Sequence, residues 1–265
     1  MSDLDLLEAR ETTRRAARTF SLACRLLPRD VRDDVYLLYL VFRTLDDLVD
    51  DGEPDAEQRL AAVEAWAARA AGERTREVRV LEALAERYPL PREAFADFCR
   101  GMRDDLEAVP IATEEDLDRY CYRVAGTVGV VMAHVLGMRD PDRALPAAAA
   151  LGQAMQRTNI LRDIDEDLAN GRVYVPSSTL SRLGASLEPG RREALLRDQI
   201  ARADALYAQG CEGIALLTRG HRAITSAAAM YRQILRQIER DGYGARAGRA
   251  VVPRRRKLIA AALAR

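Results

Sequence analysis

The sequence predicts an all-α protein that forms a single domain over residues 1–265, and three observations support this. Alanine, leucine, arginine and glutamate, which are strong helix formers, dominate the chain. Apolar residues recur three and four positions apart along most of its length, the spacing that places them on one face of a helix. The longest stretch that alternates as a strand would is residues 172–176. We therefore expect about eight to ten helices packed as one domain.

The predicted helices follow one another with short breaks. The clearest pattern runs from Val31 to Asp51, with apolar residues at positions 35, 38, 41, 42, 45, 48 and 49. Glycine and proline mark the breaks, at positions 52–54, 88–91, 140–141, 171 and 242–244. Helices are expected over about residues 5–25, 31–51, 56–71, 74–87, 91–108, 114–138, 143–169, 190–218 and 222–241.

Composition narrows the class of protein. The 41 basic and 41 acidic residues cancel, which argues against a nucleic-acid partner. The four cysteines form no CxxC pair and there are only two histidines, so free thiols are expected and a zinc site is not. Because no apolar signal sequence or spanning segment is apparent, we expect a cytoplasmic protein, either monomer or homodimer. The basic tail, which comprises Arg246, Arg249 and the run Arg254 to Lys257, is either solvated or a peripheral contact with the inner face of a membrane.

Two clusters of aspartates follow strongly apolar helical patterns. Asp46 and Asp50 are four residues apart, and Asp163 and Asp167 repeat that spacing. Residues four apart share one face of a helix, where like charges cost about 0.2–0.5 kcal/mol even when exposed. Unpaired carboxylates facing a cavity cost considerably more. Each cluster is therefore expected to be balanced by a cation.

Clustered carboxylates without histidine or cysteine favour Mg²⁺ as that cation. Magnesium keeps several waters and is commonly completed by substrate phosphates rather than by protein alone. A substrate diphosphate is therefore the expected third component. The alternative is a solvated helix face on which Arg43 and Arg162 are ordinary ion-pair partners of the aspartates.

The residues around the two clusters resemble the motifs of the squalene/phytoene synthase family, most closely its bacterial phytoene and dehydrosqualene synthases. Residues 38–51, Leu-Tyr-Leu-Val-Phe-Arg-Thr-Leu-Asp-Asp-Leu-Val-Asp-Asp, are similar to the first aspartate-rich motif. Residues 156–167, Gln-Arg-Thr-Asn-Ile-Leu-Arg-Asp-Ile-Asp-Glu-Asp, are similar to the second, which continues through residues 171–176. The glycine-containing segment 120–129, the late segment 230–235 and residues 242, 243 and 249 also match, in family order.

The resemblance implies an isoprenoid synthase fold around a central apolar cavity, in a prenyltransferase that condenses two allylic isoprenoid diphosphates head-to-head through a cyclopropyl diphosphate. It implies a cluster of about two or three Mg²⁺ ions with the ligands Asp46, Asp50, Asn159, Asp163 and Asp167. The implied catalytic residues are the same four aspartates with Tyr39, Arg43 and Tyr231. The residues implied to bind diphosphate are Arg18, Thr19, Arg43, Gln156, Asn159, Arg162, Arg172, Tyr174 and Arg249.

The substrate pair stays open at this stage. Phytoene formation from two geranylgeranyl diphosphates is the leading expectation. Squalene or dehydrosqualene formation from farnesyl diphosphate is the next, and only the squalene route requires NADPH. Prenyl transfer to a non-isoprenoid, aromatic acceptor is a third, because Ala16 and Ala17 replace polar residues usual in the family. The helix glycines Gly126 and Gly129 indicate either close helix packing or a kinked pocket wall.

Overall fold

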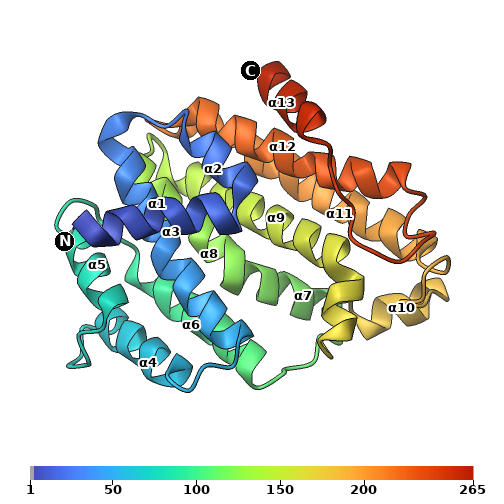
Figure 1. Cartoon of the computed structure of the whole chain (residues 1–265), viewed down its shortest axis with the longest axis horizontal. Helices are drawn as coiled ribbons and strands as arrows, with labels where there is room; N and C mark the ends of the chain where they lie inside the picture. Colours follow the sequence, from blue (N-terminus) through green and yellow to red (C-terminus); the bar gives the residue numbers. More distant parts are fainter. Residues whose placement is uncertain (1–2, 265) are drawn as a thin grey trace.

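The structure is a computed structural model that describes residues 3–264, except for the side chains of Asp3, Leu4 and Arg18. Every named element in this range is a helix, and the only β-type pairing among these residues is an isolated bridge between Met138 and Leu217. The all-α, single-domain architecture predicted from the sequence is confirmed (Figure 1). No helix in the described range is long and apolar enough to cross a membrane.

The helices follow one another along the chain with short connections. In order they are α1 (Asp3–Ala16), α2 (Arg18–Cys24), α3 (Arg29–Asp50), α4 (Ala56–Ala67), α5 (Arg76–Ala85), α6 (Arg92–Leu106), α7 (Glu114–Cys121), the π-helical segment η1 (Tyr122–Gly126), α8 (Thr127–Leu136), α9 (Pro141–Ala169), α10 (Ser177–Leu183), α11 (Glu193–Glu212), the 3₁₀ turn η2 (Ile214–Leu216), α12 (His221–Arg240) and α13 (Arg254–Leu263).

The described chain has more helices than the sequence predicted, for identifiable reasons. The predicted helix 5–25 is divided at Ala17, whose φ of −126° is not helical although no glycine or proline marks the break. The predicted helix 114–138 is interrupted by η1, where the hydrogen-bonding pattern widens. The short helix α10 lies outside the predicted ranges because seven residues carry too little periodicity. The helix α13 was taken only as a basic tail.

The core has two large apolar clusters. One is built mainly from α3 and the helices around it, including α4, α5, α6 and α8. The other joins the second half of α9 to α11 and α12. Helix α9 packs against α8, α11 and α12, so it connects the two clusters and runs through the middle of the bundle (Figure 1).

The crossing of α8 over α9 depends on glycine. A Cβ atom on Gly129 would lie 2.2 Å from the carbonyl oxygen of Ala148, and one on Gly152 would lie 2.1 Å from that of Ala125. Both contacts are with backbone, which cannot rotate away as a side chain could. Close packing of the two helices therefore explains why a glycine occupies position 129. Gly126 is the last residue of the widened segment η1.

The four cysteines are free, as expected, and only Cys211 is exposed.

Candidate active site

Both aspartate clusters lie at the C-terminal ends of their helices. Helix α3 ends at Asp50 and is followed by Gly52 with a φ of +65°, whereas α9 ends at Ala169 and is followed by Gly171 with a φ of +73°. The C-terminal end of a helix carries a partial negative charge, which adds to that of the carboxylates. The two helix ends therefore form a region that requires cations.

The first cluster is partly neutralised by Arg43, one turn earlier on α3. Arg43 donates to Asp46 at 2.9 Å and also forms an ion pair with Asp47. Burial nevertheless raises the pKa of Asp46 to about 7, and the charges of Asp50, Asp47 and Asp105 add to this effect against the attraction of Arg43. The side chain keeps 38% of its accessible surface, so small molecules can reach this carboxylate although protein surrounds much of it.

The second cluster is held by two arginines. Arg162 donates to Asp163 at 2.8 and 2.6 Å, and Arg249 approaches the same carboxylate at 2.9 Å. Burial, with the charges of Asp163 and Glu166, raises the pKa of Asp167 to about 7. For Asp167, as for Asp46, burial and like-charged neighbours thus outweigh the attraction of the nearby arginines.

The two clusters face one another. Asp50 at the end of α3 is close enough to contribute to the raised pKa of Asp167 on α9. Arg172, in the loop after α9, forms an ion pair with Asp50 and so connects the second motif to the first. The structure thus brings together side chains that are more than a hundred positions apart in the sequence.

Polar and aromatic side chains extend the region along α9. The hydroxyl of Tyr231 donates to the Asn159 carbonyl oxygen at 3.0 Å, and the Asn159 amide donates to Gln156 at 3.3 Å. Tyr39 lies half-buried on α3, with its ring centroid 5.3 Å from that of Phe20. Burial raises the pKa of Tyr39, which therefore stays a neutral phenol.

Asp105, near the end of α6, belongs to this region and was missed from the sequence. Its carboxylate accepts hydrogen bonds from Tyr174 at 2.9 Å and from Tyr120 at 3.0 Å. Burial raises the pKa of Asp105 to about 6, and the Asp50 charge contributes, against the two tyrosines and Arg172. No spacing rule relates a carboxylate on α6 to those on α3 and α9, so only the fold reveals it. Tyr120 lies in a family-like segment but was not assigned a role.

Residues 241–253, which we call the strap, connect α12 to α13 (Figure 1) and include Arg249, whose side chain reaches Asp163 of the second cluster. The Gly248 amide donates to Asp165 at 2.7 Å, and the buried Arg192 pairs with the same carboxylate. Earlier in the strap, the Tyr243 ring lies under the Arg197 guanidinium at 4.0 Å. Asp165 therefore holds the strap in place through Gly248 and Arg192, although it lies between Asp163 and Asp167 in the sequence.

The remaining predicted residues lie on α2. The contact recorded for Thr19 is with α13, since Lys257 donates to its hydroxyl at 3.0 Å. The backbone of Arg18 begins α2, but its side chain lies outside the described part of the structure. The diphosphate-binding roles of Arg18 and Thr19 therefore stay predictions.

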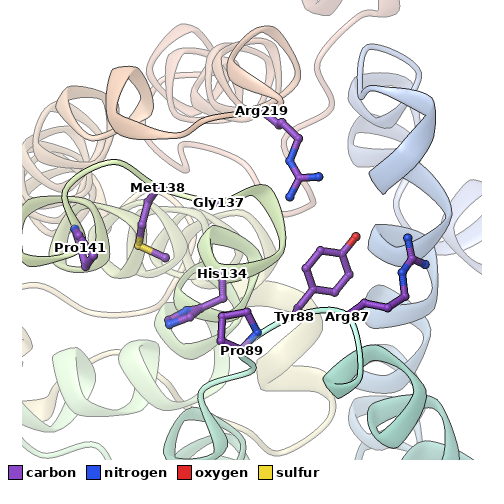
Figure 2. Close-up of a pocket in the computed structure, with 8 residues that line it drawn as sticks. All are labelled: Arg87, Tyr88, Pro89, His134, Gly137, Met138, Pro141 and Arg219. Carbon is purple, nitrogen blue, oxygen red and sulfur yellow. The ribbon is translucent and has the colours of Figure 1, made fainter.

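A cavity of about 670 Å³ is lined by other residues, among them Arg87, His134 and Arg219, and by none of the cluster aspartates (Figure 2). Its polar groups already have partners: Arg87 and Tyr88 both donate to the buried Asp34 at 2.5 Å, and Arg219 binds carbonyls at the end of α8. The central apolar cavity that the family resemblance implies stays a prediction. Half-buried apolar side chains near the aspartate-bearing helices are suited to line it, namely Phe20, Leu48, Val124, Val128 and Met132.

The capacity of this region to bind a metal ion depends on its oxygen donors. Among the described residues, no three acidic, histidine or cysteine side chains converge closely enough to hold an ion by themselves. The available donors are carboxylate and amide oxygens on two facing helices, and these suit a hard divalent cation. Such a set fits a cation whose coordination is completed by oxygens of a bound substrate.

Comparison with known proteins supports this interpretation. The squalene/phytoene synthase family matches residues 13–256. The 15-cis-phytoene synthase of Synechococcus elongatus is 36% identical over 276 residues, covering 95% of this chain and 89% of the relative. The phytoene synthase of Thermus thermophilus is 40% identical over 237 residues, covering 85% and 80%.

Solved structures agree. A dehydrosqualene synthase in complex with ligand superposes with a TM-score of 0.88 at 28% identity, covering 97% of this chain and 94% of that one. A squalene synthase from Alicyclobacillus acidocaldarius gives a TM-score of 0.78 at 29% identity, covering 91% and 95%.

An all-helical fold with two facing aspartate clusters and several arginines defines a class of enzyme that acts on diphosphates. This chain belongs to the squalene/phytoene synthase family, whose members transfer prenyl groups from isoprenyl diphosphates. The family, fold class and enzyme class predicted from the sequence are confirmed.

Proposed function

We propose that this enzyme is a phytoene synthase that condenses two molecules of geranylgeranyl diphosphate head-to-head. The observation that carries the proposal is the pair of aspartate clusters at facing helix ends, with arginines from both sides. The phytoene synthases among the relatives, at 36% and 40% identity, support the choice of substrate.

The proposed metal is Mg²⁺, held by Asp46, Asp50, Asn159, Asp163 and Asp167. When bound, it neutralises the carboxylates and stabilises negative charge that develops on the departing diphosphate. The raised pKa values of Asp46 and Asp167 support this assignment, because burial and the neighbouring carboxylates both disfavour the charged form, and a bound cation would offset that cost.

The arginines are proposed to bind the diphosphate. Arg43, Arg162, Arg172 and Arg249 each contact an aspartate of the two clusters, so their guanidinium groups already face the place where phosphate oxygens would lie. Guanidinium groups bind phosphate through paired, charge-assisted hydrogen bonds. They stabilise the leaving group as the allylic C–O bond breaks and both bonding electrons remain on the diphosphate oxygen.

The carbocation left behind requires surroundings without free water. The neutral ring of Tyr39, next to Phe20, and the ring of Tyr231 are proposed to stabilise it through their electron-rich faces. Gln156, Thr19, Arg18 and Tyr174 complete the proposed contacts to diphosphate, with Tyr174 acting from its hydrogen bond to Asp105.

Product analysis tests the proposal. Purified enzyme is incubated with Mg²⁺ and either geranylgeranyl or farnesyl diphosphate, with and without NADPH. We expect a C40 hydrocarbon from geranylgeranyl diphosphate without NADPH. A C30 hydrocarbon from farnesyl diphosphate alone would replace the assigned substrate. Recovery of both diphosphates intact or merely hydrolysed would exclude head-to-head condensation and favour an aromatic acceptor.

Dehydrosqualene or squalene synthesis is the second candidate. The observation that favours it is the close superposition, at a TM-score of 0.88, on a dehydrosqualene synthase. A reduced C30 product that appears only with NADPH would identify the squalene route.

A further inference from the structure

Helix α13 is packed with its small side chains toward the protein. Lys257, Ala260 and Ala261 lie on its half-buried side, and Ala261 contacts the cluster formed by α2 and α12. The large apolar residues face outward, with exposed fractions of 44% for Leu258, 47% for Ile259 and 77% for Leu263. A helix stabilised only by its own protein places its largest apolar side chains inward.

Basic residues accompany this apolar face. Arg254 and Arg255 are exposed in the first turn of α13, and neither has an ion-pair partner among the described residues. The sequence contains no aspartate or glutamate after Asp241, although acidic and basic residues balance over the whole chain. Just before the helix, Val251 is 71% exposed. Positive charge and exposed apolar surface thus coincide on one element.

We propose that α13 docks this enzyme peripherally on an anionic lipid surface. Leu258, Ile259 and Leu263 enter the boundary between headgroups and acyl chains, while Arg254 and Arg255 bind lipid phosphates. Figure 1 shows α13 at the edge of the molecule, beyond α12, where a flat surface can reach it.

Other occupants fit the surface less well. Two copies of α13 packed in parallel would bring their basic turns together, and like charges repel. Packed antiparallel, they would cover the apolar side chains but leave both basic turns without an acidic partner, because α13 contains no aspartate or glutamate. A nucleic acid would bind the arginines but leave the three large apolar side chains in water. A bilayer with acidic headgroups provides a partner for both features at once.

Docking would occur next to the active-site region. Lys257 of α13 binds Thr19 of α2, and the strap that precedes α13 carries Arg249 to Asp163. The helix that would enter the membrane boundary, α13, therefore directly follows the strap, which lies over the second aspartate cluster. This arrangement would let prenyl chains pass between lipid and protein, a consequence that rests on the proposed function; the docking itself does not.

Vesicle co-sedimentation of the full chain tests the proposal. The probes are large vesicles of phosphatidylcholine, with or without phosphatidylglycerol, at low and high salt. We expect binding only to the phosphatidylglycerol vesicles, weakened by salt. Arg255→Glu reverses one charge and should weaken binding by at least about fivefold, since each basic residue contributes about that factor at such a surface. Ile259→Asp should weaken it by a similar or larger factor.

Matched substitutions control for general effects. Arg143→Glu and Leu7→Asp change an exposed arginine and an exposed leucine far along the chain from α13. Both should bind vesicles as the parent does, and all four variants should keep the parent's circular dichroism and melting temperature. The proposal is overturned if the α13 variants bind as the parent does or if neutral vesicles bind equally well. It is also overturned if Ile259→Asp instead converts a dimer into a monomer in sedimentation velocity.

Discussion

Asp105 adds a carboxylate from a third helix, α6, to the candidate active site, beside the aspartates of α3 and α9. It accepts hydrogen bonds from Tyr120 and Tyr174, and its charge also raises the pKa of Asp46. We interpret Asp105 as a positioning residue that fixes the two tyrosines and attracts Arg172.

Asp105→Asn should lower kcat/KM by about tenfold to a hundredfold, because hydrogen bonds to a charged acceptor contribute about 1.5–3 kcal/mol. The neighbouring change Asp104→Asn removes only an ion pair with Arg123 and should leave steady-state kinetics almost unchanged. Equal kinetics for the two variants would mean that Asp105 is merely structural.

The pKa values of Asp46 and Asp167 are raised to about 7, against roughly 3.9 in an unfolded chain. They predict that rising pH lowers the stability of the metal-free protein but raises its affinity for Mg²⁺. A raised pKa means that the folded state favours the protonated carboxyl. The resulting stability is fully present below about pH 4 and is lost as pH rises through about 7. Metal-free protein should therefore lose melting temperature over this range.

Mg²⁺ affinity should change in the other direction, increasing between about pH 6 and 8 as these carboxylates become able to bind a cation. Titration calorimetry at several pH values measures it. A constant affinity across this range would show that neither carboxylate binds the ion.

At the scale of elements, the strap positions Arg249. The side chain is 49% exposed, so removing it should affect binding more than stability. Arg249→Ala should raise the substrate KM by roughly tenfold, as expected for the loss of a charge-assisted contact. Arg246→Ala, an exposed arginine three positions earlier in the strap, is the matched control and should retain the parent KM. If Arg249→Ala also keeps the parent KM, the solvated-tail interpretation of this residue is correct.

The stability of the protein should also depend on the close crossing of α8 over α9. Gly129→Ala should lower the free energy of unfolding by about 1–3 kcal/mol, because its Cβ meets a backbone oxygen. Adding Ala148→Gly should not restore stability, since the clash is with the Ala148 carbonyl and not with its methyl group. Thermal denaturation followed by circular dichroism measures both, and full rescue by the second change would contradict this explanation.

At the scale of the whole molecule, the two aspartate clusters join the two halves of the core. Asp46 lies on α3, a helix that contributes to one large apolar cluster. Asp163 lies on α9, whose second half contributes to the other. A diphosphate with Mg²⁺ between them would therefore stabilise the fold as a whole. At a concentration of about 100 times its Kd, a ligand adds about 2.7 kcal/mol, which corresponds to a rise in melting temperature of several degrees.

Asp46→Ala and Asp163→Ala should keep the helical circular dichroism spectrum, lose this ligand-dependent rise, and lose turnover. Inorganic diphosphate with Mg²⁺ is the probe for the thermal shift. If either variant is stabilised as strongly as the parent, the carboxylate removed does not take part in binding.

The sequence alone determined the all-α class, the family and most of the residues around the two aspartate motifs. These properties are local: helical periodicity, four-residue spacing and short motifs are all contained in neighbouring residues. The positions of Asp46, Asp50, Asp163 and Asp167 on shared helix faces follow directly from that spacing.

Only the tertiary structure decided the rest. The role of Asp105, the closure of the strap through Asp165 and Arg192, and the pairing of Arg172 with Asp50 depend on helices distant in sequence. The break at Ala17 and the outward-facing apolar side of α13 likewise depend on what each helix packs against. The physical reason is that periodicity fixes which residues share a helix face, whereas contacts between helices determine what that face meets.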